Sequence, residues 1–225
     1  MDLYIDIETV PVQRGDLRTE VASAVKPPAT LKKAESIEKW QQEERPAVEV
    51  EAIERTSFDG AYGQVCCIGW AVDDGPARSL VVADLSAEEE ARVLREWFAA
   101  IKEANAGTHG RRPTFIGFNH LSFDLPFLWK RAVVHGVRPP VWWPSDAKPW
   151  SDHVFDCMTA WAGLKDRISM DRLCRVLGIP GKDGISGADV WPMAQAGKWA
   201  DIAAYCASDV ERTRALHRRL TFAEA

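Results

Sequence analysis

The chain begins with a short apolar run that ends in two carboxylates, Leu3-Tyr4-Ile5-Asp6-Ile7-Glu8. Such a run is typical of a strand buried in the middle of a sheet. Side chains two residues apart on a strand point to the same face, so Asp6 and Glu8 should lie together. Neighbouring carboxylates repel each other unless a positive charge lies between them, and hard divalent cations prefer oxygen ligands. The pair therefore predicts a metal site or, alternatively, an ordinary solvated strand end.

The length, composition and net charge of the chain limit the class of protein. A chain of 225 residues that is 46% hydrophobic can form one domain with its own core. The net charge of −5 excludes a broad basic surface that coats nucleic acid, but not an enzyme that holds a strand end through metal ions. The five cysteines contain no C-x-x-C pair and no zinc spacing, so we expect reduced core thiols. Acidic residues within the first twenty positions argue against a signal peptide, and no apolar run is long enough to span a membrane. We therefore expect a cytoplasmic protein with no membrane partner.

The hydrophobic pattern predicts an α/β fold, with a mixed five-stranded sheet flanked by helices. Three strands come first as an antiparallel meander, and two more alternate with helices. The strands are expected at residues 3–7, 64–72, 79–83, 114–118 and 154–156. Helices are expected after Ser86, which forms a capping box with Glu89, around Pro126, after Ser169, and from about 199 to 220. The helix around Pro126 has a predicted buried face of five residues, Leu125, Leu128, Trp129, Ala132 and Val133.

Residues 11–57 differ in character from the rest of the chain. Prolines punctuate a stretch rich in Lys and Glu, with one predicted helix at 31–40. The stretch is too polar to bury a core of its own, so we interpret it as an insertion between the first two strands of a single domain that spans residues 1–225. It is either a solvated flap or a mobile arm that contacts a ligand through Lys26, Lys32 or Lys33.

Two further acids fall at positions where ligands commonly bind. Asp124 lies between the fourth strand and its helix, and ligands of open α/β sheets bind at such strand ends. Asp209 lies on the last helix, with Tyr205 one turn earlier on the same face. Each has an ordinary alternative, since Asp124 could be a helix N-cap, and Tyr205 and Asp209 could be an ordinary pair on one helix.

Taken together, these residues form a pattern that points to one family. Asp-x-Glu on the first strand, Asn-x-x-x-Phe-Asp-x-Pro in the middle and Tyr-x-x-x-Asp near the end resemble the three exonuclease motifs of the DEDDy family. These are 3′–5′ exonucleases of the DnaQ-like superfamily, which has the RNase H-like fold. The middle motif is most similar to the proofreading domain of family B DNA polymerases. The resemblance extends over residues 3–220 and implies a stand-alone relative, bacterial or encoded by a phage.

The resemblance also implies a reaction and a set of roles. It implies hydrolysis of phosphodiester bonds at the 3′ end of single-stranded nucleic acid, with DNA favoured, by two divalent cations, Mg²⁺ or Mn²⁺. Asp6 would bridge both cations, Glu8 and Asp209 would complete the first site, and Asp124 would serve the second. Tyr205 would orient the attacking water, because a phenol is largely protonated near neutral pH and is a poor base.

Four residues are candidate substrate contacts: Thr9, Asn119, Phe123 and Lys182. Thr9 follows the first acidic pair, and Asn119 and Phe123 match the middle motif. Phe123 could stack on a terminal base or simply anchor its helix, and Lys182 could bind phosphate or remain a solvated loop lysine. Three tryptophans of the loop at 138–150 form either a stacking platform or a small hydrophobic cluster: Trp142, Trp143 and Trp150.

Two other functions remain open. A 3′–5′ exoribonuclease would need a contact to the 2′-hydroxyl group, and the sequence does not identify such a contact. A non-catalytic binding module could retain the fold, but the presence of four acids and the tyrosine favours an enzyme.

Overall fold

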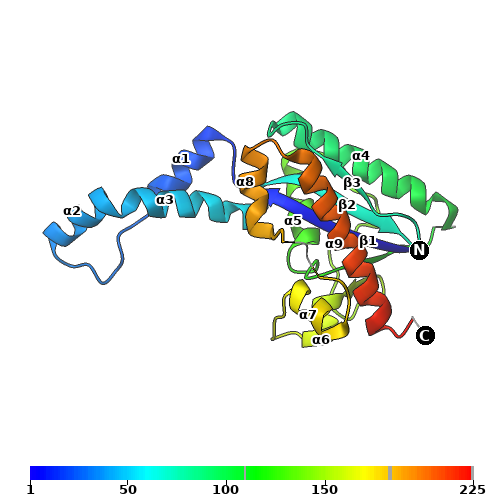
Figure 1. Cartoon of the computed structure of the whole chain (residues 1–225). Coiled ribbons are helices and arrows are strands. Elements are labelled where there is room, and N and C mark those ends of the chain that lie inside the picture. Colours follow the sequence, from blue (N-terminus) through cyan, green and yellow to red (C-terminus); the bar gives the residue numbers. More distant parts are fainter. Residues whose placement is uncertain (109, 182–183, 224–225) are drawn as a thin grey trace.

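The computed structural model describes residues 1–108, 110–181 and 184–223, and within them the chain folds around one mixed sheet (Figure 1). The sheet has the strand order β3-β2-β1-β4-β5. Its strands are β1 (Asp2–Val10), β2 (Gln64–Val72), β3 (Arg78–Val81), β4 (Thr114–Gly117) and β5 (Val154–Asp156). Strand β1 pairs antiparallel with β2 and parallel with β4, and β5 extends the parallel part. The predicted α/β class with a five-stranded mixed sheet is confirmed.

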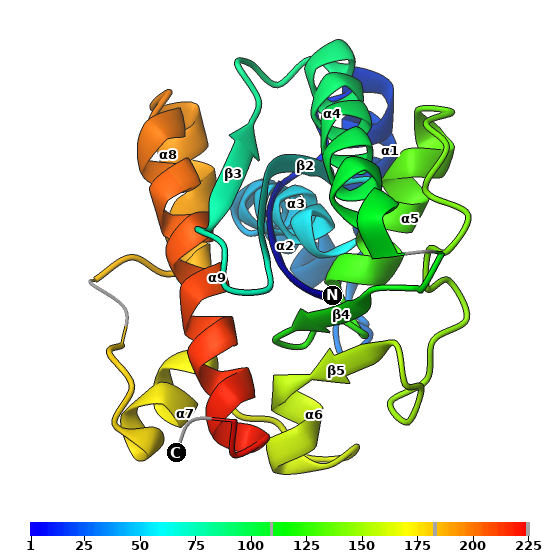
Figure 2. The same cartoon turned by 90° about the vertical axis from the view of Figure 1, so that its right-hand side faces the viewer.

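Helices cover both faces of this sheet. Figure 2 shows α4 (Ala87–Asn105) and α5 (Asp124–Val134) on one side and α9 (Trp199–Leu220) on the other. Alternation along β1 fits these layers, since Leu3 packs in the larger core cluster with Trp97 of α4, whereas Tyr4 packs in a second cluster with Leu216 of α9. Three shorter helices complete the fold: α6 (Cys157–Ala162), α7 (Met170–Leu177) and α8 (Val190–Gln195). No helix in the described ranges is long and apolar enough to cross a membrane.

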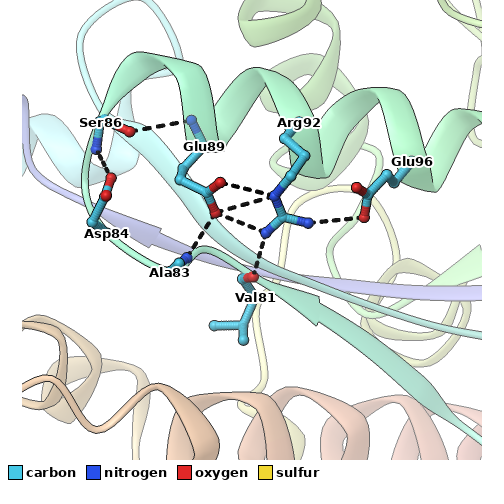
Figure 3. A network of polar contacts seen from close by, with 7 residues as sticks. All are labelled: Val81, Ala83, Asp84, Ser86, Glu89, Arg92 and Glu96. Carbon is cyan, nitrogen blue, oxygen red and sulfur yellow. Dashed lines mark hydrogen bonds and ion pairs between the residues drawn. The ribbon is translucent and has the colours of Figure 1, made fainter.

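A network of polar contacts fixes the start of α4 beside β3 (Figure 3). The Ser86 side chain accepts a hydrogen bond from the Glu89 backbone at 3.2 Å, as predicted. The Glu89 carboxylate, however, accepts from the Ala83 backbone at 2.9 Å, while the Ser86 N–H donates to Asp84 at 2.8 Å. The predicted capping box is therefore half formed, because Asp84 takes the place of the glutamate. Arg92 donates to the same Glu89 carboxylate at 2.8 Å and ties the first two turns together.

The buried face of α5 differs from the predicted one. Trp129 and Val133 are 41% and 61% exposed, so their predicted burial is wrong. Phe127 and Arg131 are buried instead. The physical reason is a buried ion pair, in which Arg131 Nη2 lies 2.7 Å from Glu90 of α4 and turns that side of the helix inward. A charged residue at a buried position is invisible to a search for apolar periodicity.

Residues 11–57, all of which the structure describes, form an arm that projects from the sheet (Figure 1). The arm contains three helices and not one, namely α1 (Gly15–Ser23), α2 (Ala34–Glu43) and α3 (Arg45–Glu54). A short 3₁₀ turn, η1 (Arg55–Phe58), joins the arm to the approach of β2. Of these helices the predicted one overlaps α2, whose Trp40 is buried, whereas within this described segment no residue of α1 or α3 is buried. Helices without a buried stripe leave no periodic signal.

The tryptophans of the loop before β5 form a cluster in part. Trp143 is 6% exposed and packs edge-on against aromatic rings of α4 and β4, at centroid distances of 5.4 to 5.9 Å. Trp142 packs against Phe115 at 5.9 Å. Trp150 is 74% exposed and lies outside this cluster. The cluster interpretation is confirmed for the first two residues and is wrong for the third.

Candidate metal centre

Strand β1 presents two acids on the face that α9 covers. Asp6 is half-buried and Glu8 is 8% exposed. The Cys206 thiol of α9 lies 3.5 Å from Asp6 Oδ2, and one ligand atom from each of these three residues lies within 4.8 Å of the others. Burial raises the pKa of Cys206 well above its usual value, so the thiol is neutral and donates to the carboxylate. No pattern in the sequence indicates that Cys206 lies in the site, because an isolated cysteine on an apolar helix face is normally a core residue.

The close approach of α9 depends on a glycine in β2. Gly69 lies directly opposite Asp6 in the β1–β2 ladder. A Cβ atom at position 69 would lie 2.8 Å from the Cys206 sulfur and 3.0 Å from a methyl group of Val210. These distances are shorter than real Cβ contacts, so any side chain here would push α9 away from the sheet. Glycine therefore lets the helix bring Tyr205 and its neighbours over the acids of β1.

Tyr205 and Asp209 lie on the face of α9 that turns toward β1, and both are buried. Burial is the main cause that raises the pKa of the Tyr205 phenol. The negative charges of Glu8, Asp209 and Asp6, in that order, raise it further, as does a hydrogen bond to Asp209. The phenol therefore stays protonated and can donate a hydrogen bond, and it lies within the field of three carboxylates.

A buried arginine adjoins the same carboxylate. Arg212 Nη1 donates to Asp209 Oδ1 at 2.6 Å, and Nη2 donates to the Gly181 carbonyl at 3.1 Å. The arginine is 9% exposed. Arg212 was not among the predicted site residues, although its spacing of three from Asp209 on a helix is a signal for an ion pair. Arg212 places a fixed positive charge beside the acid cluster.

Asp124, far from β1 in the sequence, contacts this strand from the start of α5. It is the first residue of α5, with Phe123 at the N-cap position, so it is not the helix cap. Its Oδ1 accepts a hydrogen bond from the Ile7 backbone at 3.1 Å, and Ile7 lies between the two acids of β1. Burial raises the pKa of Asp124 to about 7, and the charge of Asp156 contributes to the rise. A buried carboxyl with this pKa holds a proton that a bound cation would displace.

The loop that precedes Asp124 is shaped by Asp156 at the end of β5. Its carboxylate accepts hydrogen bonds from the backbone N–H groups of Asn119 and Leu121, at 3.1 and 3.2 Å. Burial alone would raise the pKa of Asp156, but His120 beside it and the backbone donors hold that pKa below its usual value. Asn119 adopts a φ of +62°, a conformation that asparagine tolerates, and its side chain accepts from Arg167 at 3.1 Å. Asp156 thus stabilises the turn at the start of the middle motif.

The remaining candidate substrate contacts lie in different places. Thr9 donates its hydroxyl to the Ser57 carbonyl at 2.7 Å and thereby holds the base of the arm. The Phe123 ring is half-buried and lies 6.4 Å from the Phe58 ring, between the arm and α5. Lys182 lies outside the described residues. The substrate-binding roles of Thr9, Asn119 and Phe123 stay predictions.

Comparison with known proteins identifies a family to which the sequence is similar. A family described as predicted 3′–5′ exonucleases related to the exonuclease domain of PolB matches residues 59–225. The match includes Asp124, Tyr205 and Asp209 and begins after the acidic pair of β1. No curated protein sequence matches the chain.

The fold recurs in a solved polymerase structure. The family B DNA polymerase from the hyperthermophilic archaeon Pyrobaculum calidifontis aligns with a TM-score of 0.59 over 97% of this chain, at 17% identity. The chain spans about a quarter of the length of that polymerase, since the alignment covers 24% of it. At this identity the likeness shows the fold, which is RNase H-like as predicted. The chain belongs to the family of predicted 3′–5′ exonucleases related to the exonuclease domain of PolB.

Proposed function

We propose that residues 1–225 act as one exonuclease domain that hydrolyses phosphodiester bonds at the 3′ end of single-stranded nucleic acid, with DNA favoured. The observation that carries the proposal is the gathering of acids around one point of β1. Asp6 and Glu8 leave the strand on the α9 side, and the pKa of Tyr205 responds to both of them and to Asp209. Asp124 joins the same strand through its hydrogen bond to Ile7.

The donor set fits two divalent cations, Mg²⁺ or Mn²⁺. Its atoms are carboxylate oxygens, which hard cations prefer, and the charges of Glu8, Asp209 and Asp6 add to the effect of burial in raising the pKa of Tyr205. Asp6, Glu8 and Asp209 would hold one cation, and Asp6 with Asp124 the other. When bound, two cations supply an activated water, in-line alignment and neutralisation of the charge on phosphate.

The chain's own residues have distinct parts in this reaction. Tyr205 remains protonated, and its one O–H, which bonds to Asp209 in this structure, would turn to the attacking water and orient it. Cys206 is a soft, neutral ligand that hard cations do not favour, so its role is to orient Asp6 by donating to its carboxylate. Arg212 holds Asp209 in place through a buried hydrogen bond.

A direct test uses 5′-labelled single-stranded DNA and RNA oligonucleotides with Mg²⁺ or Mn²⁺. We expect a metal-dependent ladder that shortens from the 3′ end, and the faster polymer identifies the substrate, DNA or, in the alternative, RNA. Asp6→Ala and Asp124→Asn should abolish the ladder. Binding of either polymer without any cleavage by the wild-type protein would replace the proposal with a non-catalytic binding module.

A further inference from the structure

A cavity of about 330 Å³ opens between the base of the arm and α8, where α3 ends beside α8 (Figure 1). Its lining includes residues of three segments, the end of β1, the arm with η1, and α8: Thr9, Glu54, Arg55, Phe58 and Trp191. Thr9 directly follows Glu8 in β1, so the cavity begins one residue along the strand from the candidate metal centre. The β1 and arm residues of its lining precede the family match, which begins at residue 59, whereas Trp191 lies within that match.

The most exposed aromatic side chain of this cavity is Phe58, with 74% of its surface accessible. The turn that carries it is nevertheless held by three hydrogen bonds. Thr9 donates to the Ser57 carbonyl at 2.7 Å, the Val12 backbone donates to Thr56 at 2.8 Å, and Thr56 donates to the Ile53 carbonyl at 2.6 Å. A fixed support thus holds an apolar ring at the edge of the cavity, with most of its surface accessible.

Phe58 also contacts the middle motif. Its ring lies 6.4 Å from that of Phe123, at an interplanar angle of 55°. Phe123 directly precedes Asp124, and Thr9 directly follows Glu8. Phe58 therefore packs against the residue that precedes Asp124, and Ser57 beside it is bonded by the residue that follows Glu8.

The charges around the cavity indicate which part of a nucleotide it can hold. Glu51 and Glu54 contribute carboxylates, and Arg55 lies 3.6 Å from Glu51. Two acids and one paired arginine do not favour a phosphate group. An aromatic face with polar groups around it suits a nucleobase, which stacks through its ring and bonds through its edge.

We propose that this cavity binds an unpaired base of the substrate strand near its 3′ end, stacked on Phe58. The inference rests on the proposed exonuclease function and assigns the arm a share in selecting single-stranded ends. A base in a duplex is already paired and stacked, so it cannot enter a cavity in this position without leaving its helix.

The test compares Phe58→Ala with Phe222→Ala, a matched control in which an equally apolar, 88% exposed ring is removed at the far end of α9. Cleavage is measured on two single-stranded DNA oligonucleotides, one with normal bases and one with abasic residues at its last three positions. We expect Phe58→Ala to raise the KM for the normal strand about tenfold, which corresponds to one lost stacking contact. Phe58→Tyr should restore it, and Phe58→Ala should add no further loss on the abasic strand.

Two outcomes would overturn the inference while the proposed function stands. One is equal KM values for Phe58→Ala and Phe222→Ala on the normal strand, and the other is an equal loss on both strands. If the wild-type protein cleaves neither strand, the proposed function fails and the cavity is judged by binding alone. In that case, the protein is mixed with a strand that carries 2-aminopurine at its 3′ end, and the fluorescence of that base is measured. Quenching by the wild type that is lost in Phe58→Ala would support the base site. Equal quenching by both proteins would overturn it.

Discussion

Arg212 donates a 2.6 Å hydrogen bond to Asp209 one turn earlier on α9, and both side chains are buried. The pair lies where the proposed mechanism requires a cation ligand. A fixed guanidinium beside this carboxylate offsets part of the repulsion among the acids and holds Asp209 in one orientation. It also links the site to the Gly181 carbonyl, which accepts from the same arginine at 3.1 Å.

We predict that Arg212→Ala raises the Mg²⁺ concentration needed for half-maximal cleavage and lowers the rate, each by roughly 10- to 100-fold. The reason is that Asp209 loses its orienting donor. The matched control is Arg214→Ala, because Arg214 is also buried and ion-paired but donates to carbonyls of the 73–75 turn. A metal requirement that changes equally in both variants would show that Arg212 contributes only to stability.

Replacing Gly69 should separate α9 from β1. In Gly69→Ala the new methyl group meets the Cys206 sulfur at 2.8 Å, so the helix must shift or the sheet must distort. We expect a loss of about 1–3 kcal/mol in the free energy of unfolding and a larger relative loss of nuclease activity. Chemical denaturation and cleavage rates measure the two effects. Gly15→Ala is the control, since nothing lies within 4 Å of a Cβ at that position, and full activity of Gly69→Ala would contradict the prediction.

The parts of the fold with a strong hydrophobic period could be predicted from the sequence. The last helix has its predicted limits, 199–220, and β5 has its predicted limits, 154–156. Asp6 and Glu8 share a face because alternation on a strand leaves no other choice.

Other features depend on contacts between distant segments, which no local pattern encodes. Asp156 supports the middle motif through backbone groups 35 and 37 residues away. Phe58 meets Phe123 across the base of the arm. The buried charge of Arg131 makes sense only beside Glu90 of another helix. Such pairings are selected by tertiary packing, which overrides the local preference of each residue.

That buried pair gives a stability prediction. Glu90 is bonded by Arg131 at 2.7 Å, by His135 at 2.7 Å and by the Val65 backbone at 2.8 Å. Arg131→Met should therefore cost about 3–5 kcal/mol, because it leaves a buried carboxylate without its main counter-charge. The double variant Arg131→Met with Glu90→Gln should recover part of this loss, as urea denaturation would show. A double variant less stable than the single one would indicate that His135 and Val65 dominate the network.

The last prediction concerns the pH dependence of the metal-free protein. The pKa of Asp124 rises to about 7 from an ordinary value of 3.8, mainly through burial. A carboxyl with a raised pKa in the folded state stabilises the protein fully at pH values below its ordinary pKa. Its contribution is lost as the pH rises through the folded pKa.

In the presence of a chelator, the wild-type protein should therefore lose stability between about pH 4 and pH 7, and Asp124→Asn should lose less. At the upper pH this variant should be the more stable by roughly 2–4 kcal/mol, since asparagine keeps the acceptor for Ile7 without the buried charge. Mg²⁺ should reverse the order by stabilising the wild type alone.

Asp156→Asn is the control of opposite sign, because the pKa of Asp156 is held below its ordinary value. It should destabilise the protein near neutral pH, and the difference should shrink as the pH falls through the pKa of the folded state. Urea denaturation at the two pH values, and also below pH 3.8 for Asp156→Asn and the wild type, measures all three proteins with and without Mg²⁺. If Asp124→Asn is less stable than the wild type at the upper pH without metal, other groups of the protein already stabilise the ionised carboxylate of Asp124. A bound cation would then not be needed to hold it ionised.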